Sequence, residues 1–380
     1  MARGARSFAY GALAVVLAQA LASRGLSPVA IGAVITTALL AGALSSASTG
    51  ALVNRFGART TFAASGIAMA AAGALLAGNP ACIVAACLLG VVSPGGQDVG
   101  PFAAIEQVAL AAGAGHVMRR LSWYNVAGAT AFALGALGAA VLPYTGVLLC
   151  YALTGAIVVV VARSLPDVRV AAPPAPDVVQ KTRFGVVERL ASLFALDAFA
   201  GGFVVQAFVA YWFALRFGVG AETIGPLLFA ANLLAAASYV LASRVAARIG
   251  LLRTMVFTHL PSNVLLCVIP FMPTFSLAAA VLLARFALSQ MDVPTRQAYT
   301  LSLVPAHDRA RAAGVTGAVR PAAASVAPVL TGIAFQFAGL GLPFVVAGGI
   351  KIVYDLLLLA TFRNVSAVAG NSLVEITREA

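Results

Sequence analysis

Apolar stretches long enough to cross a bilayer alternate with short polar turns along almost the whole chain. A membrane-spanning helix needs about 20 consecutive, mostly apolar residues. Twelve segments fit this pattern: 6–22, 29–51, 60–78, 81–112, 121–142, 144–163, 189–214, 222–243, 254–271, 274–303, 312–338 and 341–362. The pattern therefore predicts an all-α integral membrane protein with 12 transmembrane helices.

The long polar stretch 164–188 separates the sixth predicted span from the seventh, and its prolines and mixed charges are typical of a linker. We predict an N-terminal six-helix bundle over 1–163, a cytoplasmic linker over 164–188, a C-terminal six-helix bundle over 189–363 and a cytoplasmic tail over 364–380. Helix kinks or breaks are expected where prolines interrupt 81–112 and 274–303.

A short basic turn between predicted spans occurs twice in the chain. Three positions align between the copies at an offset of 193 residues: Gly32 with Gly225, Arg55 with Arg248, and Gly57 with Gly250. The chain is therefore predicted to consist of two related, pseudo-symmetric halves, an organisation typical of membrane carriers.

Lysine and arginine are distributed unevenly between the two ends of the predicted spans. With the N-terminus in the cytoplasm, 18 of these residues fall in cytoplasmic segments and only Arg24 and Arg216 on the opposite side. This bias predicts a multi-pass protein of the cell inner (plasma) membrane with both termini in the cytoplasm. An alternative is that Arg3, Arg6 and the following apolar stretch form a cleaved secretory signal, which would leave eleven spans.

The composition agrees with a membrane protein, since hydrophobic residues make up 61% of the chain, charged residues 9%, and the mean hydropathy is +0.98. The bilayer must therefore be the solvent for most of the surface. The net charge of +12 does not indicate nucleic-acid binding, because the basic residues occur in small groups between apolar runs. The lipid bilayer is the expected surrounding, and we expect a monomer.

The first basic turn resembles the signature loop of the major facilitator superfamily. Gly50, Arg55, Gly57 and Arg59 match the signature, whereas Asn54 stands where that family usually has an aspartate. The resemblance implies two six-helix bundles around a central cavity, alternating access and transport of a small solute. Among the subgroups of the superfamily, the chain is most similar to bacterial efflux-type permeases.

The two basic turns are candidate gating loops. Gly50 is expected to let two helices approach closely and Gly57 to permit a tight reversal, while the arginines hold the turn at the anionic cytoplasmic face. Arg248 and Gly250 would do the same in the second half. The alternative is that these arginines only set the topology.

Acidic residues inside the predicted spans are candidates for substrate binding or proton coupling, because buried charges are costly. Asp98 follows a Pro-Gly-Gly sequence, which resembles an interrupted helix that opens backbone groups to a solute. The alternative for Asp98 is a charge near the cytoplasmic helix end. Asp197 lies inside a span that also holds Gln206, and an unpaired carboxylate there would favour protonation. The alternative is a structural ion pair between Asp197 and Arg320.

The segment 274–303 carries further candidates. Arg285 lies near the middle of the membrane and therefore needs an anionic partner or an anionic solute. Asp292 and Arg296 are four residues apart and could pair on one helical face.

Other polar residues in the last spans are given simpler interpretations. Asn232, like Gln206, is a candidate hydrogen-bond partner for a solute. We interpret Lys351 and Asp355 as a buried pair within one helix, and His259 as a satisfied buried histidine.

These features favour a secondary active transporter of a small organic solute, with proton-coupled efflux as the leading hypothesis. A proton symporter for uptake and a passive facilitator are alternatives, and a membrane-embedded enzyme or a non-transporting receptor is more remote. The cysteines lie in apolar runs and the three histidines on separate segments, so no metal, no cofactor and no catalytic residue is expected.

Overall fold

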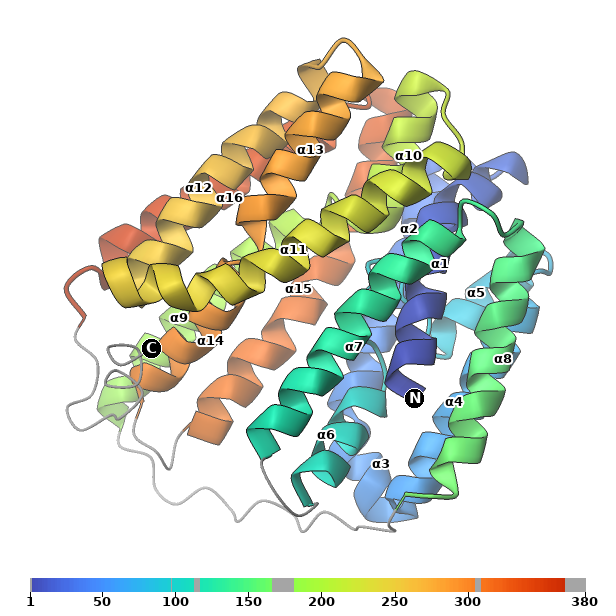
Figure 1. Ribbon diagram of the computed structural model, residues 1–380, viewed down its shortest axis with the longest axis horizontal. Helices are drawn as coiled ribbons and strands as arrows, with labels where there is room; N and C mark the ends of the chain where they lie inside the picture. The colour runs from blue at the N-terminus through green and yellow to red at the C-terminus, as the bar shows by residue number, and fades with distance from the viewer. Residues whose placement is uncertain (1, 97, 113–116, 166–180, 305–308, 366–380) are drawn as a thin grey trace. The chain divides into compact units, whose positions relative to one another are not determined.

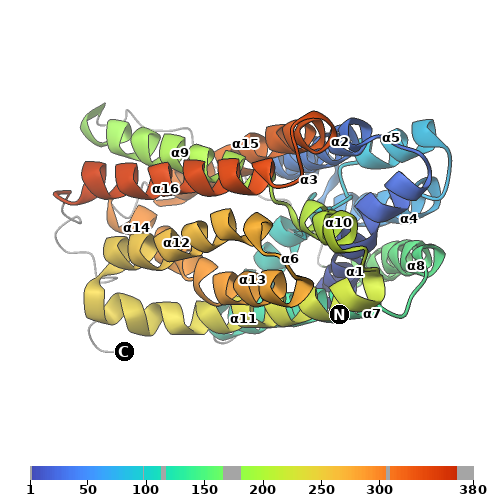
Figure 2. The same ribbon diagram turned by 90° about the horizontal axis from the view of Figure 1, so that it is seen from above.

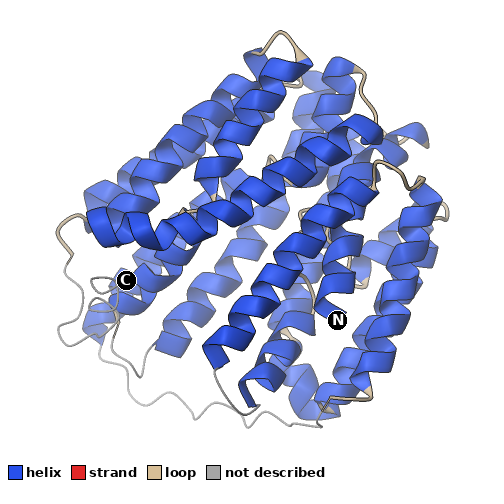
Figure 3. Cartoon of the chain, viewed as in Figure 1, coloured by secondary structure: helices blue, strands red, loops and turns tan. Residues whose placement is uncertain are grey.

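The computed structural model describes residues 2–96, 98–112, 117–165, 181–304 and 309–365, and regular structure in these residues is helical (Figure 3). The helices of the first half are α1 (Ala2–Ser23), α2 (Pro28–Ala47), α3 (Thr49–Phe56), α4 (Ala58–Leu75), α5 (Pro80–Leu88), α6 (Phe102–Ala112), α7 (Val117–Gly138) and α8 (Tyr144–Ala162).

The second half continues this pattern of long helices and short breaks. Its helices are α9 (Lys181–Gly202), α10 (Gln206–Phe217), α11 (Ala221–Ile249), α12 (Leu251–Val268) with a 3-10 turn (Ile269–Phe271), α13 (Phe275–Ser289), α14 (Asp292–Ser302), α15 (Arg309–Phe337) and α16 (Leu342–Phe362).

Nine helical segments in the described residues are long and apolar enough to cross a membrane. They correspond one by one to nine of the twelve predicted spans. The other three predictions fall on α4, on the short helices α5 and α6, and on α7. Alanine, glycine and hydroxyl residues make α4 only weakly apolar, α5 and α6 are too short, and α7 begins with basic residues.

The chain forms two compact units. Unit 1 comprises Met1–Ala175, Val205–Ala230 and Pro328–Phe337, and unit 2 comprises Pro176–Val204, Ala231–Ala327 and Ala338–Ala380. Residues 205–230 and 328–337 belong to unit 1, although they fall inside the predicted C-terminal bundle. The predicted domain bounds remain a prediction.

Within unit 1, α1 packs against α7 and α4 packs against α8 (Figure 1). The α4–α8 contact depends on glycine, because a Cβ atom on Gly155 would lie 2.4 Å from the backbone nitrogen of Ala70 and 2.5 Å from the backbone oxygen of Gly66. Small residues at such positions let two membrane helices approach closely.

This contact gives a first prediction. Gly155→Ala should destabilise the protein by about 1–3 kcal/mol, because α4 and α8 must separate to accept the methyl group. Gly349→Ala is the matched control, since a Cβ atom there meets no described atom within 4 Å, and it should be neutral or slightly stabilising. Thermal unfolding of the purified protein checks both, and equal shifts for the two variants would contradict the assignment of this contact.

Within unit 2, α16 packs against both α9 and α12, and α12 also packs against α13 (Figures 1 and 2). Buried apolar side chains of α9, α12, α14 and α16, with Leu303 directly after α14, form one core cluster: Leu190, Phe194, Met255, Val256, Tyr299, Leu303, Tyr354, Leu358 and Phe362. This core fixes the positions from which the charged side chains of the same helices project.

Both proline-containing segments are broken, as predicted. The predicted span 81–112 is interrupted between Leu88 and Phe102, where the chain leaves the helix for the segment that carries Asp98. The span 274–303 breaks between Ser289 and Asp292, and Pro294 then lies in the first turn of α14, where a proline costs no helical hydrogen bond.

A third break, between Gly202 and Gln206, was not expected. The predicted span over 189–214 is thus present as a membrane-spanning segment, but it is not one continuous helix. The paired glycines at 201 and 202 weaken the helix at this point, since glycine has a low helix propensity.

The duplicated turn has the same backbone conformation in both copies. Gly57 has φ 84° and ψ 156°, and Gly250 has φ 85° and ψ 160°, a region that favours glycine. In both copies the threonine four residues later, Thr61 or Thr254, donates its hydroxyl to the glycine carbonyl at 2.8 Å. The internal repeat is thus present in geometry as well as in sequence, and the expected tight reversal at Gly57 is observed.

Candidate functional site

Buried charged side chains from five helices of unit 2 converge on Asp197. We call this group the unit 2 charge cluster, and it consists of Asp197 on α9, His259 on α12, Asp292 and Arg296 on α14, Arg320 on α15, and Lys351 and Asp355 on α16. All but Arg320 are almost fully buried.

Asp197 is the centre of this cluster, with 2% of its surface exposed. Its Oδ1 accepts a hydrogen bond from Lys351 Nζ at 2.5 Å, and its Oδ2 accepts one from Arg320 Nη1 at 3.0 Å. His259 Nε2 and Arg296 Nη1 each lie 3.8 Å from one of its oxygens. The predicted pair between Asp197 and Arg320 is therefore formed, but it is one part of a larger network.

Asp292 and Arg296 form the pair that their spacing predicted. Arg296 Nη1 donates to Asp292 Oδ2 at 2.5 Å, within one turn of α14. The same guanidinium lies over the ring of Phe194, with 5.5 Å between Cζ and the ring centroid. This second contact holds Arg296 between its own helix and α9.

His259 connects two carboxylates of the cluster. Its Nδ1 lies 2.9 Å from Asp355 Oδ1, and its Nε2 lies 3.8 Å from Asp197 Oδ1. Asn263, one turn later on α12, donates to Asp355 Oδ2 at 2.8 Å. His259 is buried and satisfied, as predicted, although its partners are titratable groups.

The predicted pair between Lys351 and Asp355 is wrong. Although the two residues are four apart on α16, the amine of Lys351 goes to Asp197 on α9, and the carboxylate of Asp355 goes to His259 and Asn263 on α12. Each therefore finds a partner on another helix. The sequence signal for Lys351 was present, since a lysine inside a predicted span is costly without a function or a partner.

Arg285 lies on α13, outside the hydrogen bonds and ion pairs of the cluster. Among the described residues, its charged group has one recorded contact, with the ring of Phe286 at 5.3 Å. Its Nε is buried without a hydrogen-bond partner. No carboxylate of the described part of unit 2 forms an ion pair with Arg285, although the charges of Asp197 and Asp292 act on it from a longer distance.

A separate group of charges lies in unit 1, and we call it the unit 1 charge cluster: Arg3 and Arg6 on α1, Asp98 in the break between α5 and α6, Glu106 on α6, and Tyr124 on α7. Its central residue is Arg6, which is fully buried. Arg6 Nη1 and Nη2 donate to the two oxygens of Glu106 at 2.8 and 2.7 Å, and Nη2 also lies 3.4 Å from Asp98 Oδ2.

Asp98 and Glu106 therefore form ion pairs with α1. Arg3 also pairs with Asp98, and the hydroxyl of Tyr124 donates to Glu106 Oε2 at 2.8 Å. Neither Arg3 nor Arg6 is a site candidate from the sequence, because basic residues beside the first apolar stretch are typical of topology or signal-peptide function. The role of Asp98 in substrate binding or proton coupling stays a prediction.

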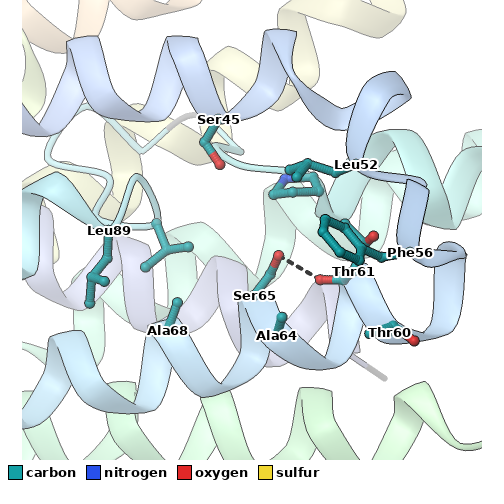
Figure 4. A pocket seen from close by; sticks show the side chains of 11 residues that line it. Ser45, Leu52, Phe56, Thr60, Thr61, Ala64, Ser65, Ala68 and Leu89 are labelled. Atoms are coloured by element: carbon teal, nitrogen blue, oxygen red, sulfur yellow. Dashed lines mark hydrogen bonds between the residues drawn. The ribbon is translucent and has the colours of Figure 1, made fainter. Parts of the chain in front are cut away.

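A hollow in unit 1 of about 380 Å³ lies among α2, α3, α4 and the interrupted segment (Figure 4). The side chains around it are apolar or carry hydroxyl groups, and Ser65 Oγ donates to the Thr61 carbonyl at 2.9 Å. Its lining includes no ionisable residue, so it is separate from the candidate charged residues.

Two further candidates, Gln206 and Asn232, were predicted to contact a solute. Gln206 begins α10, beyond the third break, so helical periodicity does not place it on one face with Asp197. Asn232 is half-buried on α11. Whether either contacts a solute stays a prediction.

The residues of the duplicated turns have different surroundings. A Cβ atom on Gly50 would meet no described atom within 4 Å, so the expected close approach of helices at Gly50 is wrong. Arg59 donates to the carbonyl of Leu165 at 3.0 and 3.2 Å, whereas Arg55 and Arg248 are exposed. Asn54, in the aspartate position of the signature, is also exposed.

The sequence profile of the Major Facilitator Superfamily matches residues 1–289 of this chain. Since the match covers more than half of the 380 residues, the chain belongs to the Major Facilitator Superfamily. It is a multi-pass membrane protein of this superfamily of secondary transporters.

Similar proteins support the fold. The nucleoside transporter NupG superposes with a TM-score of 0.74 at 12% identity, over 95% of this chain and 97% of that chain. The xylose transporter XylE from E. coli, in an inward open conformation, superposes with a TM-score of 0.70 at 15% identity, over 100% and 97%. These likenesses confirm the predicted all-α, multi-span fold of the superfamily.

A curated relative is similar in sequence over part of its length. The uncharacterized membrane protein YJR124C of Saccharomyces cerevisiae is 28% identical over 188 residues, which is 49% of this chain. The matched region spans 42% of that relative, so less than half of its length is represented.

Proposed function

We propose that this transporter exports a small organic solute in exchange for protons, by alternating access. The observation that carries the proposal is the imidazole of His259, which lies between the carboxylates of Asp355 at 2.9 Å and Asp197 at 3.8 Å. Histidine is the side chain that ordinarily changes its charge between pH 5 and 8, and carboxylates and histidines inside membrane helices commonly form proton relays.

The contacts of Asp197 suggest how proton binding would affect the rest of the site. Asp197 holds Lys351 and Arg320 at 2.5 and 3.0 Å while it is ionised. Protonation of Asp197 would remove the charge that holds these two cations and would rearrange the cluster, so that the solute would bind in the ionised arrangement and be released in the protonated one. Proton uptake and solute binding would thereby be linked through one carboxylate.

Asp197 and Arg320 are therefore proposed coupling residues, and Asp292 is proposed to hold Arg296 in place beside them. Asp98 is proposed as a second coupling candidate in unit 1, and Gln206 and Asn232 as solute-binding candidates. The duplicated turns are proposed gating loops, for which the matched geometry of Gly57 and Gly250 is the support.

The membrane orientation is proposed from the distribution of basic residues. The 18-to-2 bias supports cytoplasmic termini and, for an efflux-type permease, the plasma membrane. The domain bounds proposed from the sequence, with a linker over 164–188, are part of the same proposal.

The main experiment begins with a thermal-stability screen of the purified protein against a solute panel at pH 6 and pH 8, since a bound solute raises the melting temperature. A hit is then added to protein in weakly buffered solution with a pH indicator. Proton-coupled export predicts proton release on solute binding. Binding without any proton exchange would support a passive facilitator.

The direction of coupling is tested in proteoliposomes. With the lumen acidic, an exchanger accumulates the solute in the lumen as protons leave, whereas a symporter accumulates it only under the opposite gradient. Accumulation under the opposite gradient would replace the export proposal with the uptake alternative.

His259 gives a further prediction. His259→Gln keeps a hydrogen bond to Asp355 but cannot carry a proton, so the pH dependence of solute binding between pH 5 and 8 should flatten. Thr258→Val, at the neighbouring position on α12, should keep the wild-type pH profile. An unchanged profile in His259→Gln would remove His259 from the coupling mechanism.

A further inference from the structure

The ionisable groups on the unit 2 helices around Asp197 include four cations and three carboxylates, and two of the cations, Arg285 and Arg320, are half-buried. The cations are Arg285, Arg296, Arg320 and Lys351, and the carboxylates are Asp197, Asp292 and Asp355. The excess is one positive charge with His259 neutral and two with His259 protonated. A buried net charge is costly in a membrane protein unless a further anion compensates it.

Each of the three carboxylates is already engaged. Asp197 is shared by Lys351 and Arg320, and Asp292 is held by Arg296 at 2.5 Å. Asp355 accepts from Asn263 and lies beside His259. The group without a carboxylate within 4 Å in the described residues is the guanidinium of Arg285. Arg285 is therefore the cation of this group without a direct ion pair among the described residues, although the charges of Asp197 and Asp292 act on it from a longer distance.

A second polar atom near Arg285 is also unsatisfied. Ser289 lies one turn later on α13, with 4% of its surface exposed, and its Oγ is buried without a hydrogen-bond partner. Residues four apart project from the same face of a helix, so Arg285 and Ser289 present a guanidinium and a hydroxyl side by side. Buried donors without partners are rare in native proteins and call for an explanation.

We propose that Arg285 and Ser289 bind the anionic group of the transported solute, which makes the substrate an organic anion with a carboxylate or phosphate group. A planar guanidinium with several N–H donors suits such a group, and a serine hydroxyl adds one further donor. Ser262 Oγ donates to the backbone carbonyl of Arg285 at 3.4 Å, and the contact between α12 and α13 supports this turn (Figure 1). The proposal rests on the proposed transport function and names its substrate class.

The first test needs no solute and compares two arginines of unit 2. Arg285→Gln removes a cation that no described carboxylate needs, so the melting temperature of the solute-free protein should stay equal or rise. Arg296→Gln leaves Asp292 without its cation, so the melting temperature should fall. A fall for Arg285→Gln as large as for Arg296→Gln would show that Arg285 is a structural partner and would overturn the proposal.

The second test measures anion binding with benzoate, succinate, citrate and inorganic phosphate, at constant ionic strength maintained with sodium chloride. At least one of these anions should raise the melting temperature of the wild type, and benzamide, the neutral counterpart of benzoate, should not. Arg285→Gln should weaken the affinity roughly tenfold or more, as expected for the loss of a charge-assisted hydrogen bond. Ser289→Ala should weaken it by a smaller factor and leave the melting temperature of the solute-free protein unchanged.

The exposed Arg244 on α11 supplies the matched control, and Arg244→Gln should bind anions like the wild type. Equal stabilisation of the wild type and Arg285→Gln by every anion, or stabilisation only by neutral or cationic compounds, would overturn the proposal. If only the proposed proton coupling fails, the anions will still bind through Arg285, but their binding will neither release nor take up protons.

Discussion

Asp197→Asn will abolish solute transport and strongly lower the stability of the purified protein. The carboxylate is 2% exposed and holds Lys351 at 2.5 Å and Arg320 at 3.0 Å. The amide keeps the shape of the side chain but removes its charge, so the buried Lys351 and the partly exposed Arg320 lose their counter-ion. Removing one partner of a buried ion pair costs on the order of 3–5 kcal/mol.

The matched control for Asp197→Asn is Glu188→Gln, which neutralises an exposed acid on the same helix and should change neither quantity. Thermal unfolding measures the stability, and uptake by proteoliposomes of a solute from the thermal screen measures transport. A loss of less than about 1 kcal/mol, typical of an exposed pair, would contradict the central position of Asp197 in the cluster.

A double variant separates coupling from structure. Asp197→Asn combined with Lys351→Met removes the anion together with one of its cations and should recover part of the lost stability, because fewer buried charges are unpaired. If Asp197 only stabilises the fold, transport should recover along with stability. Recovered stability without proton-linked transport is the result expected from the proposed coupling role.

Arg6→Gln will be the most damaging change in unit 1. Arg6 has no exposed surface, donates to both oxygens of Glu106 at 2.8 and 2.7 Å, and lies over the ring of Phe102 with 4.4 Å between Cζ and the ring centroid. Its loss leaves two carboxylates, Glu106 and Asp98, with less compensation. We expect a stability loss of about 3–5 kcal/mol.

Arg6→Lys should restore only part of the stability, because one ammonium cannot reproduce the two parallel hydrogen bonds to Glu106. Arg55→Gln is the control, since Arg55 is exposed and its charged group lies over the neighbouring ring of Phe56. Unfolding in detergent measures all three variants. Equal stability of Arg6→Gln and Arg55→Gln would show that the unit 1 charge cluster contributes little to the fold.

Together, the variants separate two kinds of buried charge in this protein. Asp197, Arg296 and Arg6 have partners within hydrogen-bond distance, so their removal leaves an opposite charge uncompensated. Arg285 has no such partner among the described residues, so its removal should affect solute binding more than stability. A loss of stability on replacing Asp197, Arg296 or Arg6, but none on replacing Arg285, is therefore the signature of the proposed anion site.

The sequence by itself determined the fold class, the internal repeat and several local pairs. Hydrophobic length predicted membrane helices because the bilayer thickness fixes how many apolar residues a span needs. The prolines predicted the breaks before α6 and α14, and the glycines at 57 and 250 predicted a tight turn that needs positive φ. The pair of Asp292 with Arg296 followed from spacing, since residues four apart are neighbours on any helix.

Only the tertiary structure decided which charges meet across helices. Lys351 and Asp355 have the same spacing as Asp292 and Arg296. Lys351 nevertheless binds Asp197 on α9, and Asp355 contacts His259 on α12. Arg3 and Arg6 had the appearance of topology signals, but the packing of α1 brings them to Asp98 and Glu106. Helix packing brings together residues that are distant in the chain, and the low dielectric of the interior then makes those contacts decisive for the buried charges.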